Sequence, residues 1–234
     1  HLSERFGATW RAIETDGFRI DRKVDMLECN DDPVAIAKSI GTAVAGFAEA
    51  FRQFQPDLLV LLGDRFEILA AAIAALPAAI PIAHIHGGEL TEGAFDDSIR
   101  HALTKMAHLH FTAAPEYTRR VIQMGEQPTR VFTVGALGID QIAATPVMSK
   151  QEVEQAVGIS LGKASLLVTY HPVTQEPAEI QDRAETFFRA LDRIPELSII
   201  LTGVNADTGN ATVDAAARRF IERNHSRVAY RASF

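Results

Sequence analysis

The stretch LLVLLGDRFEILAAAIAAL, from Leu58 to Leu76, decides the fold of this chain. It begins with an apolar run that has no polar alternation, which predicts a strand buried on both faces, as in a parallel sheet. Gly63, Asp64 and Arg65 end this strand, and the apolar pattern then resumes as a helix that runs to about Leu76. A strand that passes directly into a helix predicts the beginning of a β-α-β unit.

Asp64 and Arg65 are the unusual residues of this stretch, because a chain can place charged side chains anywhere on its surface. In open parallel sheets, ligands bind beyond the carboxyl ends of the strands, which is where these two residues fall. A structural alternative stays open for Asp64, since aspartate is also a common N-cap of the helix that follows a strand. We expect Arg65 to start that helix.

Strand and helix patterns alternate along almost the whole chain, which predicts an α/β fold with parallel sheets. The clearest helix has Asp32 and Pro33 as cap and first residue and runs to about Phe54. Its apolar stripe at helical spacing consists of Ile36, Ile40, Val44, Phe47 and Phe51. A break near Pro146 predicts two domains, residues 1–146 and 147–234. The expected helices cover residues 3–17, 33–54, 65–76, 97–108, 116–124, 137–143, 150–157, 178–194 and 212–223, and the expected strands 57–62, 80–85, 109–113, 130–134, 164–170, 197–202 and 227–231.

The composition of the chain limits the kinds of protein that it can be. The net charge of −7 makes the chain a poor general partner for nucleic acid or an anionic membrane. The longest apolar run, residues 68–83, is interrupted by prolines and is too short to span a bilayer. Cys29 is the single cysteine, so no internal disulfide can form and we expect a cytoplasmic protein. The chain begins with His1 and ends in a strand-like segment, and we therefore expect a fragment of a longer protein.

Polar clusters follow four of the expected strands: GDR, HIHGGE, GALGID and YHPVT. Because the carboxyl ends of parallel strands meet at one edge of a sheet, these clusters predict a ligand site. His171, in the last cluster, stands alone and by itself is more often structural than functional. The loop 203–211 has the Asn, Asp and Gly content of an ordinary turn.

The densest polar segment is HIHGGELTEGAFDDSIRHALTK, residues 84–105. We expect His84 and His86 to face the same side of an extended segment. Gly87 and Gly88 allow a close approach of the backbone to a ligand. A metal site made of His84, His86 and the carboxylate of Glu89 or Asp96 is an alternative, but no tight ligand spacing accompanies it, and we expect no metal.

The helix that follows this segment begins with acidic residues. Asp96 or Asp97 can cap it, and Asp97, Arg100 and His101 fall within about one turn of one another. The sequence contains no GxGxxG, P-loop, Cys-based zinc motif or G-x-S-x-G elbow. An oxidoreductase, a phosphotransferase or a serine hydrolase therefore has little support, and we expect no organic cofactor.

Five segments carry a resemblance to a known family: LGDRFE, AHIHGGELTEGAFDDSIRHALTK, HLHF, VGALGID and YHPVT. On these segments the chain resembles the hydrolysing UDP-N-acetylglucosamine 2-epimerases of sialic acid biosynthesis. The resemblance implies two Rossmann-like domains of the glycosyltransferase-B type, facing each other across a cleft, and a homodimer or homotetramer. It also implies that the first domain lacks its N-terminal strand and that the second, nucleotide-binding domain is incomplete.

In that family, UDP-N-acetylglucosamine loses UDP by elimination across C1 and C2, and water adds to the glycal to give N-acetylmannosamine. Related enzymes act on a di-N-acetylated bacillosamine nucleotide on the way to legionaminic acid. Three alternatives stay open: a non-hydrolysing epimerase, a sugar-nucleotide binding module without turnover, and a glycosyltransferase of the same architecture.

The resemblance also implies site residues. Asp64 and Asp96 match family carboxylates, Asp97 is too close to Asp96 to be separated from it, and His86 stands where many relatives have a catalytic glutamate in H-I-E-G-G-E. This departure leaves the proton assignment open, since histidine can act as acid or base and Glu89 is an alternative. We therefore predict Asp64, His86, Asp96 and Asp97 as catalytic residues, and Arg65, Gly88, Glu89, Arg100, His101, His171, Asn205 and Phe234 as residues that bind the UDP-sugar.

Overall fold

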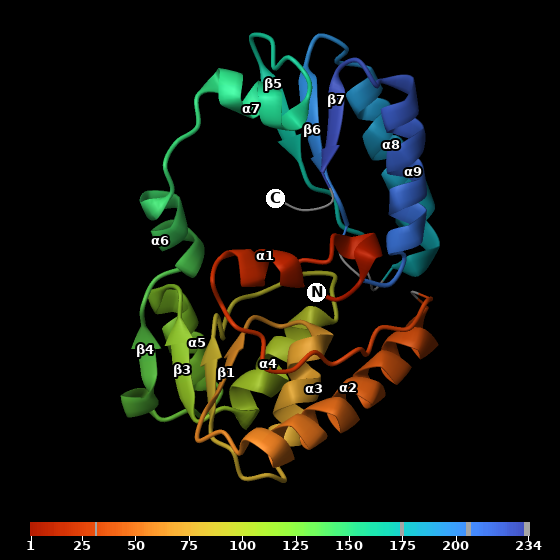
Figure 1. Cartoon of the computed structure of the whole chain (residues 1–234). Helices are drawn as coiled ribbons and strands as arrows, with labels where there is room; N and C mark the ends of the chain where they lie inside the picture. The colour runs from red at the N-terminus through yellow and green to blue at the C-terminus, as the bar shows by residue number, and fades with distance from the viewer. Residues whose placement is uncertain (31, 174–175, 205–206, 232–234) are drawn as a thin grey trace. The chain divides into compact units, whose positions relative to one another are not determined.

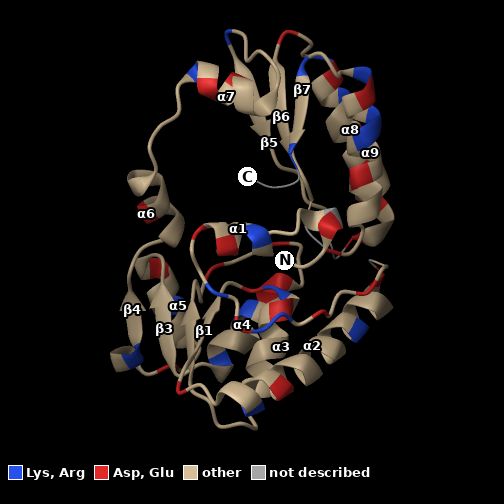
Figure 2. Ribbon diagram, in the orientation of Figure 1, with Lys and Arg blue, Asp and Glu red and all other residues tan. Residues whose placement is uncertain are grey.

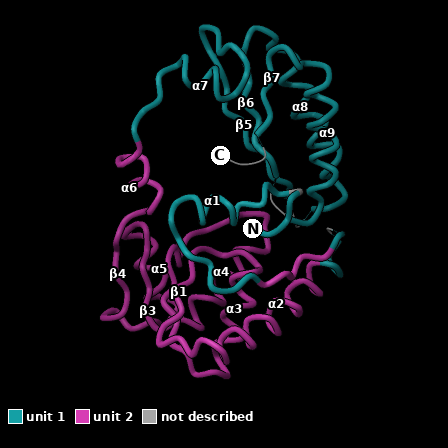
Figure 3. The backbone as a smooth tube through the Cα atoms, in the orientation of Figure 1, with its two compact units in different colours: residues 1–23, 29–35, 146–234 teal, residues 24–28, 36–145 magenta. Residues whose placement is uncertain are grey.

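The computed structural model describes residues 1–30, 32–173, 176–204 and 207–231 (Figure 1). The chain divides into two compact units, which Figure 3 shows in two colours. Unit 2 contains residues 24–28 and 36–145, and unit 1 contains residues 1–23, 29–35 and 146–234. The chain changes unit next to Pro146, where the sequence predicts a boundary, but the N-terminal segments are grouped with the residues that follow Pro146. The two functional domains, 1–146 and 147–234, stay a prediction.

Unit 2 is built on a parallel sheet of four strands in the order β1-β2-β3-β4. The strands are β1 (Leu59–Leu62), β2 (Ile82–Ile85), β3 (Leu109–Thr112) and β4 (Val131–Thr133), and they alternate with the helices α3 (Phe66–Ala75), α4 (Asp96–Met106) and α5 (Pro115–Gln123). The register places the last residues of β1 and β2 side by side, as Leu62 pairs with Ile85. The carboxyl ends of the strands therefore share one edge, as the sequence predicts.

The core cluster of unit 2 combines buried residues of the helix α2 (Pro33–Phe54) with residues of β1, α3, β2 and α4. The backbone N–H of Ala35 donates to Asp32 Oδ1 at 2.8 Å, which confirms Asp32 as the cap of this helix. The predicted apolar stripe is also confirmed, since Ile36 and Phe51 are buried in the core cluster. By length and composition alone α2 could cross a membrane, but this stripe packs in the protein core.

The strand β1 corrects the expectation of a strand buried on both faces. Leu61 is buried, but Val60 is 57% exposed and Leu62 is 51% exposed. Successive side chains of a strand point to opposite faces, so only the face that carries Leu61 is covered by the described residues. The central strand β2 fits the expectation better, because Ile82 and Ala83 are both buried.

Unit 1 contains a second parallel sheet in the order β5-β6-β7. Its strands are β5 (Ser165–Val168), β6 (Ser198–Thr202) and β7 (Val228–Arg231), and its helices include α7 (Lys150–Val157), α8 (Ile180–Asp192) and α9 (Asn210–Arg223). Phe188 and Phe220 are buried between helices and sheet, with ring centroids 5.3 Å apart. The outer faces of α8 and α9 carry charges of both signs (Figure 2), and Arg223 pairs with Asp192 at 3.0 Å.

Short elements complete the fold: η1 (Glu4–Phe6), α1 (Trp10–Thr15), η2 (Pro128–Arg130), α6 (Leu137–Ala144) and η3 (Pro177–Glu179). The single helix expected from Ser3 to Gly17 is wrong, because the segment is divided into η1 and α1. Gly7 causes the division, since its φ of +86° is a left-handed conformation that ends η1. Ser3 lies at the N-cap position of η1 without a side-chain capping bond.

Two glycines of α2 provide a matched test of the packing in unit 2. A Cβ added at Gly46 would lie inside van der Waals contact of Val24 Cγ1, whereas a Cβ at Gly41 meets no atom of the described chain within 4 Å. We expect Gly41→Ala to raise the free energy of unfolding by about 0.5–1 kcal/mol through helix propensity. Gly46→Ala should lower it by about 1–3 kcal/mol through overpacking.

Urea denaturation of the two variants measures both effects, and Val24→Ala combined with Gly46→Ala should recover most of the loss. Equal stabilisation by the two alanines would contradict the packing of α2 on Val24.

Candidate functional site at the carboxyl edge of the first sheet

The turn after β1 separates the roles of the two charged residues that the sequence singles out. Gly63 has a φ of +86°, and Arg65 occupies the N-cap position of α3 in an extended conformation without a side-chain capping bond. The structural alternative for Asp64 as the cap of this helix is therefore wrong. Asp64 Oδ2 instead accepts a hydrogen bond from the guanidinium of Arg100, a residue of α4. Arg65 pairs with Glu67, with 3.3 Å between Nε and Oε2.

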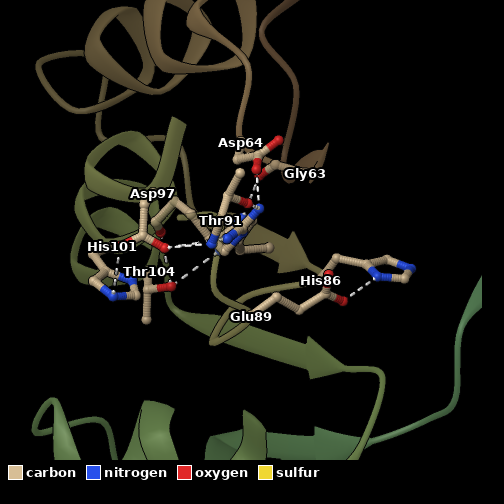
Figure 4. Close-up of polar contacts among 10 residues, drawn as sticks. Gly63, Asp64, His86, Glu89, Thr91, Asp97, His101 and Thr104 are labelled. Carbon is tan, nitrogen blue, oxygen red and sulfur yellow. Dashed lines mark hydrogen bonds and ion pairs between the residues drawn. The ribbon is translucent and has the colours of Figure 1, made fainter. Parts of the chain in front are cut away.

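Arg100 is the centre of the polar contacts at this edge, because its guanidinium contacts Asp64, Thr91 and Asp97, which Figure 4 labels. It is only 5% exposed, and beside its bond to Asp64 its Nη2 donates to Thr91 Oγ1 at 2.8 Å. Its Nη1 lies 3.5 Å from Asp97 Oδ1. One buried cation thus lies between two carboxylates from different elements, a pairing that offsets the cost of removing it from water. The prediction that Arg100 binds substrate is not tested by these contacts.

Asp96 and Asp97 begin α4 but neither is its N-cap, because Phe95 occupies that position. Asp97 Oδ1 instead accepts the backbone N–H of Thr91 at 2.9 Å, which fixes the loop between β2 and α4 to the first turn of this helix. Asp97 Oδ2 also lies 3.8 Å from Nε2 of His101. Four predicted site residues are therefore brought together here, namely Asp64, Asp97, Arg100 and His101.

His84 has a structural role that the sequence does not indicate. It is fully buried, its Nε2 donates to the carbonyl of Gly63 at 2.7 Å, and its Nδ1 lies 3.3 Å from Thr104 Oγ1. Burial lowers the pKa of His84 from 6.5 to about 4, so the ring is neutral at physiological pH. Among the described residues no group of three or more His, Cys, Asp or Glu could hold a metal ion.

His86 differs from His84 in backbone conformation, so the extended segment on which the same-side expectation rests does not include His86. The strand β2 ends at Ile85, and His86 has a φ of +66°, which is unusual for a residue with a side chain. Its Nδ1 lies 2.6 Å from Oε1 of Glu89, and both side chains are partly exposed. Figure 4 shows this pair apart from Asp64, Thr91 and Asp97.

The double glycine is explained by packing against the helices of unit 2. Gly87 is buried, and a Cβ there would lie 3.0 Å from Thr104 Oγ1. Gly88 has a φ of +81°, and a Cβ there would lie 2.5 Å from the carbonyl oxygen of Tyr117. The carbonyl of Gly88 accepts a hydrogen bond from Arg120 on α5. These glycines let the loop approach α4 and α5, so their presence needs no ligand, and the role of Gly88 in binding stays a prediction.

The last three predicted residues are His171, Asn205 and Phe234. His171 follows β5 in unit 1 and is exposed. Asn205 and Phe234 lie outside the described residues. Three residues of the site were missed by sequence reasoning, namely Thr91, Thr104 and Arg120. Of these three, only Thr104 could have been found from the sequence, because it lies four residues after Arg100 and hence on the same face of α4.

The fold and this edge place the chain in a defined class. The model of the UDP-N-acetylglucosamine 2-epimerase family matches residues 1–231, and the chain belongs to that family. It is 39% identical over 224 residues to the GDP/UDP-N,N'-diacetylbacillosamine 2-epimerase (hydrolyzing) of Campylobacter jejuni, a match that covers 96% of this chain and 58% of the relative. The corresponding enzyme of Legionella pneumophila is 36% identical, with 97% of this chain and 60% of the relative covered.

Solved structures agree on the fold. The chain matches the UDP-GlcNAc 2-epimerase of Neisseria meningitidis bound to UDP-GlcNAc with a TM-score of 0.73 at 16% identity, over 100% of this chain and 62% of that one. The Methanocaldococcus jannaschii enzyme in complex with UDP-GlcNAc and UDP gives 0.72 at 14% identity, over 98% and 62%. The predicted α/β class with parallel sheets of the glycosyltransferase-B type is confirmed. The chain spans about 60% of the length of these relatives.

Arg100→Met tests the importance of the buried guanidinium. The substitution leaves Asp64 and Asp97 without their shared cation, and we expect the free energy of unfolding to fall by about 3–5 kcal/mol. Arg52→Met is the matched control, because Arg52 forms an exposed pair with Glu49. The control should cost at most about 1 kcal/mol. Chemical denaturation of both variants measures the two losses of unfolding free energy. Equal losses would contradict the central role of Arg100.

His84 makes stability depend on pH in a predictable direction. Its pKa is about 4 in the folded protein and ordinarily 6.5, so the unfolded chain binds the proton more tightly. The resulting stability is present in full above pH 6.5 and is lost as the pH falls toward 4, by roughly 3 kcal/mol. We expect His84→Gln, followed by denaturation across this range, to show a smaller loss than the wild type. An unchanged pH dependence would exclude His84 as its source.

Proposed function

We propose that the protein is a hydrolysing 2-epimerase that acts on a UDP-linked 2-acetamido sugar. The observation that carries the proposal is the gathering of carboxylates and a histidine–glutamate pair at the carboxyl edge of one parallel sheet. Asp64 follows β1, His86 and Glu89 follow β2, and Asp97 belongs to the first turn of α4. This edge is where open α/β sheets bind their ligands.

The chemistry of the reaction demands groups of this kind. The proton on C2 of the sugar is barely acidic, so a base must remove it while the bond from C1 to UDP breaks. A second acid or base must then help water to add to the glycal. Asp64, His86, Asp96 and Asp97 are the proposed acid–base residues, in agreement with the resemblance of the sequence.

The diphosphate that leaves with UDP needs hydrogen-bond donors to stabilise its negative charge. Arg65 has a side chain that is 30% exposed, next to the N-terminus of α3, which favours negative charge. We assign Arg65 and His171 to the diphosphate, and Gly88, Glu89, Arg100 and His101 to the surroundings of the sugar. Asn205 and Phe234 are assigned to the nucleotide from the sequence alone.

The substrate is proposed from the relatives. The proteins of C. jejuni and L. pneumophila are named for N,N'-diacetylbacillosamine nucleotides, and both are described as hydrolyzing. The N. meningitidis relative, a UDP-N-acetylglucosamine 2-epimerase, is 28% identical. UDP-N,N'-diacetylbacillosamine is therefore the first choice and UDP-N-acetylglucosamine the second. This comparison favours the hydrolysing reaction over the non-hydrolysing one.

Other properties follow from the same proposal. Elimination and hydration move protons and no redox electrons, so the reaction requires no redox cofactor. A homodimer or homotetramer is the proposed assembly, as in the family that the sequence resembles. The cytoplasm is the proposed compartment, where the exposed thiol of Cys29 stays reduced.

Proton NMR of the natural protein with each nucleotide sugar in deuterated water tests the proposal. We expect UDP together with a free sugar that carries deuterium at C2 and is inverted there. UDP-N,N'-diacetylbacillosamine should have the higher kcat/KM. A product that keeps UDP attached would favour the non-hydrolysing epimerase. Binding of either nucleotide sugar without turnover would favour the binding module.

A further inference from the structure

The contact between His86 and Glu89 determines which ring nitrogen carries the proton. Nδ1 of His86 lies 2.6 Å from Oε1 of Glu89. A neutral imidazole has one N–H and a carboxylate can only accept, so the N–H belongs to Nδ1. Nε2 then carries the lone pair. Within the described part of the chain, Nε2 has no hydrogen-bond partner, and the side chain is 21% exposed.

The pair stands on a loop that the rest of unit 2 holds in place. The backbone N–H of His86 donates to the carbonyl of Phe111 at 2.8 Å, which extends the β2–β3 ladder by one bond. Arg120 holds the carbonyl of Gly88, and Asp97 accepts the N–H of Thr91 at 2.9 Å. An imidazole held on such a loop is pre-organised to accept a proton, because little rearrangement is needed at the moment of reaction.

His86 also has a backbone conformation that costs stability. A residue with a Cβ at a φ of +66° is disfavoured by about 1–3 kcal/mol. The imidazole of His86 contacts Glu89 and is partly exposed, whereas His84 is fully buried. The two histidines are two residues apart. His84 is enclosed by protein atoms, whereas Nε2 of His86 is available to accept a proton.

We infer that His86 Nε2 is the base of the elimination and that Glu89 is its positioning residue, an assignment that rests on the proposed function. Nε2 takes the proton from C2 of the sugar, and the electrons of the C2–H bond form the C1–C2 double bond. The C1–O bond breaks, and its electrons leave on UDP. Glu89 balances the positive charge of the imidazolium through a charge-assisted hydrogen bond.

The glycal is then hydrated, and every proton of the reaction is accounted for. Water supplies the hydroxyl group at C1 and releases a proton, and a solvent proton adds to C2 from the opposite face, which inverts that carbon. His86 releases its proton to solvent, so that one water is consumed and one proton accompanies the UDP. Asp64 and Asp97 already bind the guanidinium of Arg100, which leaves the imidazole as a base outside that network.

The tautomer of His86 can be measured without turnover. Nitrogen-15 NMR of the 234-residue chain, at a pH about two units above the ordinary imidazole pKa, reports which nitrogen is protonated. The signals that disappear in His86→Gln identify this ring among the 8 histidines. We expect Nδ1 to carry the proton in the wild type and to lose that preference in Glu89→Ala. A proton on Nε2 in the wild type would overturn the inference.

A double-mutant cycle on the natural protein tests the catalytic part. We expect His86→Gln to lower kcat by about 10²–10⁴-fold. Glu89→Ala should also lower kcat, and the double variant should be no slower than His86→Gln, because Glu89 acts through the histidine. Glu92→Ala, at an exposed position of the same loop, is the control and should leave kcat unchanged.

The outcomes separate the inference from the proposed function. Independent, multiplicative losses in the cycle would mean that Glu89 acts on the substrate directly, which would overturn the dyad and leave the epimerase reaction standing. A wild-type protein that turns over neither nucleotide sugar would overturn the proposed function and the catalytic assignment with it. The tautomer measurement would then still decide whether the pair exists.

Discussion

A single buried guanidinium ties together the three chain segments that form the candidate site. Arg100 is 5% exposed and contacts the turn after β1, the loop after β2 and the first turn of its own helix. A charge removed from water must be compensated by partners, so Asp64, Thr91 and Asp97 are held where Arg100 needs them. The position of the carboxylates at the sheet edge therefore depends on the packing of α4.

The loop between β2 and α4 extends this constraint to the proposed acid–base residues. Its glycines fit against Thr104 and Tyr117, where a Cβ would come too close. Arg120 and Asp97 bind the backbone of this loop at Gly88 and Thr91, and His86 has a left-handed backbone within it. Strain of this kind persists only where the surrounding structure determines it, and it is typical of functional sites.

Much of the fold could be predicted from local patterns. The helix α2 and the order of strands and helices were predicted correctly, because apolar periodicity and capping residues act over a few positions. The expected helix at residues 3–17 failed because Gly7 interrupts it. The expected burial of β1 failed because burial depends on what covers each face of the sheet, and Val60 and Leu62 lie on a face that the described residues leave open.

The sequence by itself determined the α/β class, the family and the sheet edge at which the polar residues gather. Only the tertiary structure decided the partners of those residues. Asp64 pairs with a residue 36 positions away, Glu89 orients His86, and His84 serves the core instead of a ligand. The physical reason is that periodicity and capping are local, whereas hydrogen-bond partners and burial are set by elements that meet only when the chain has folded.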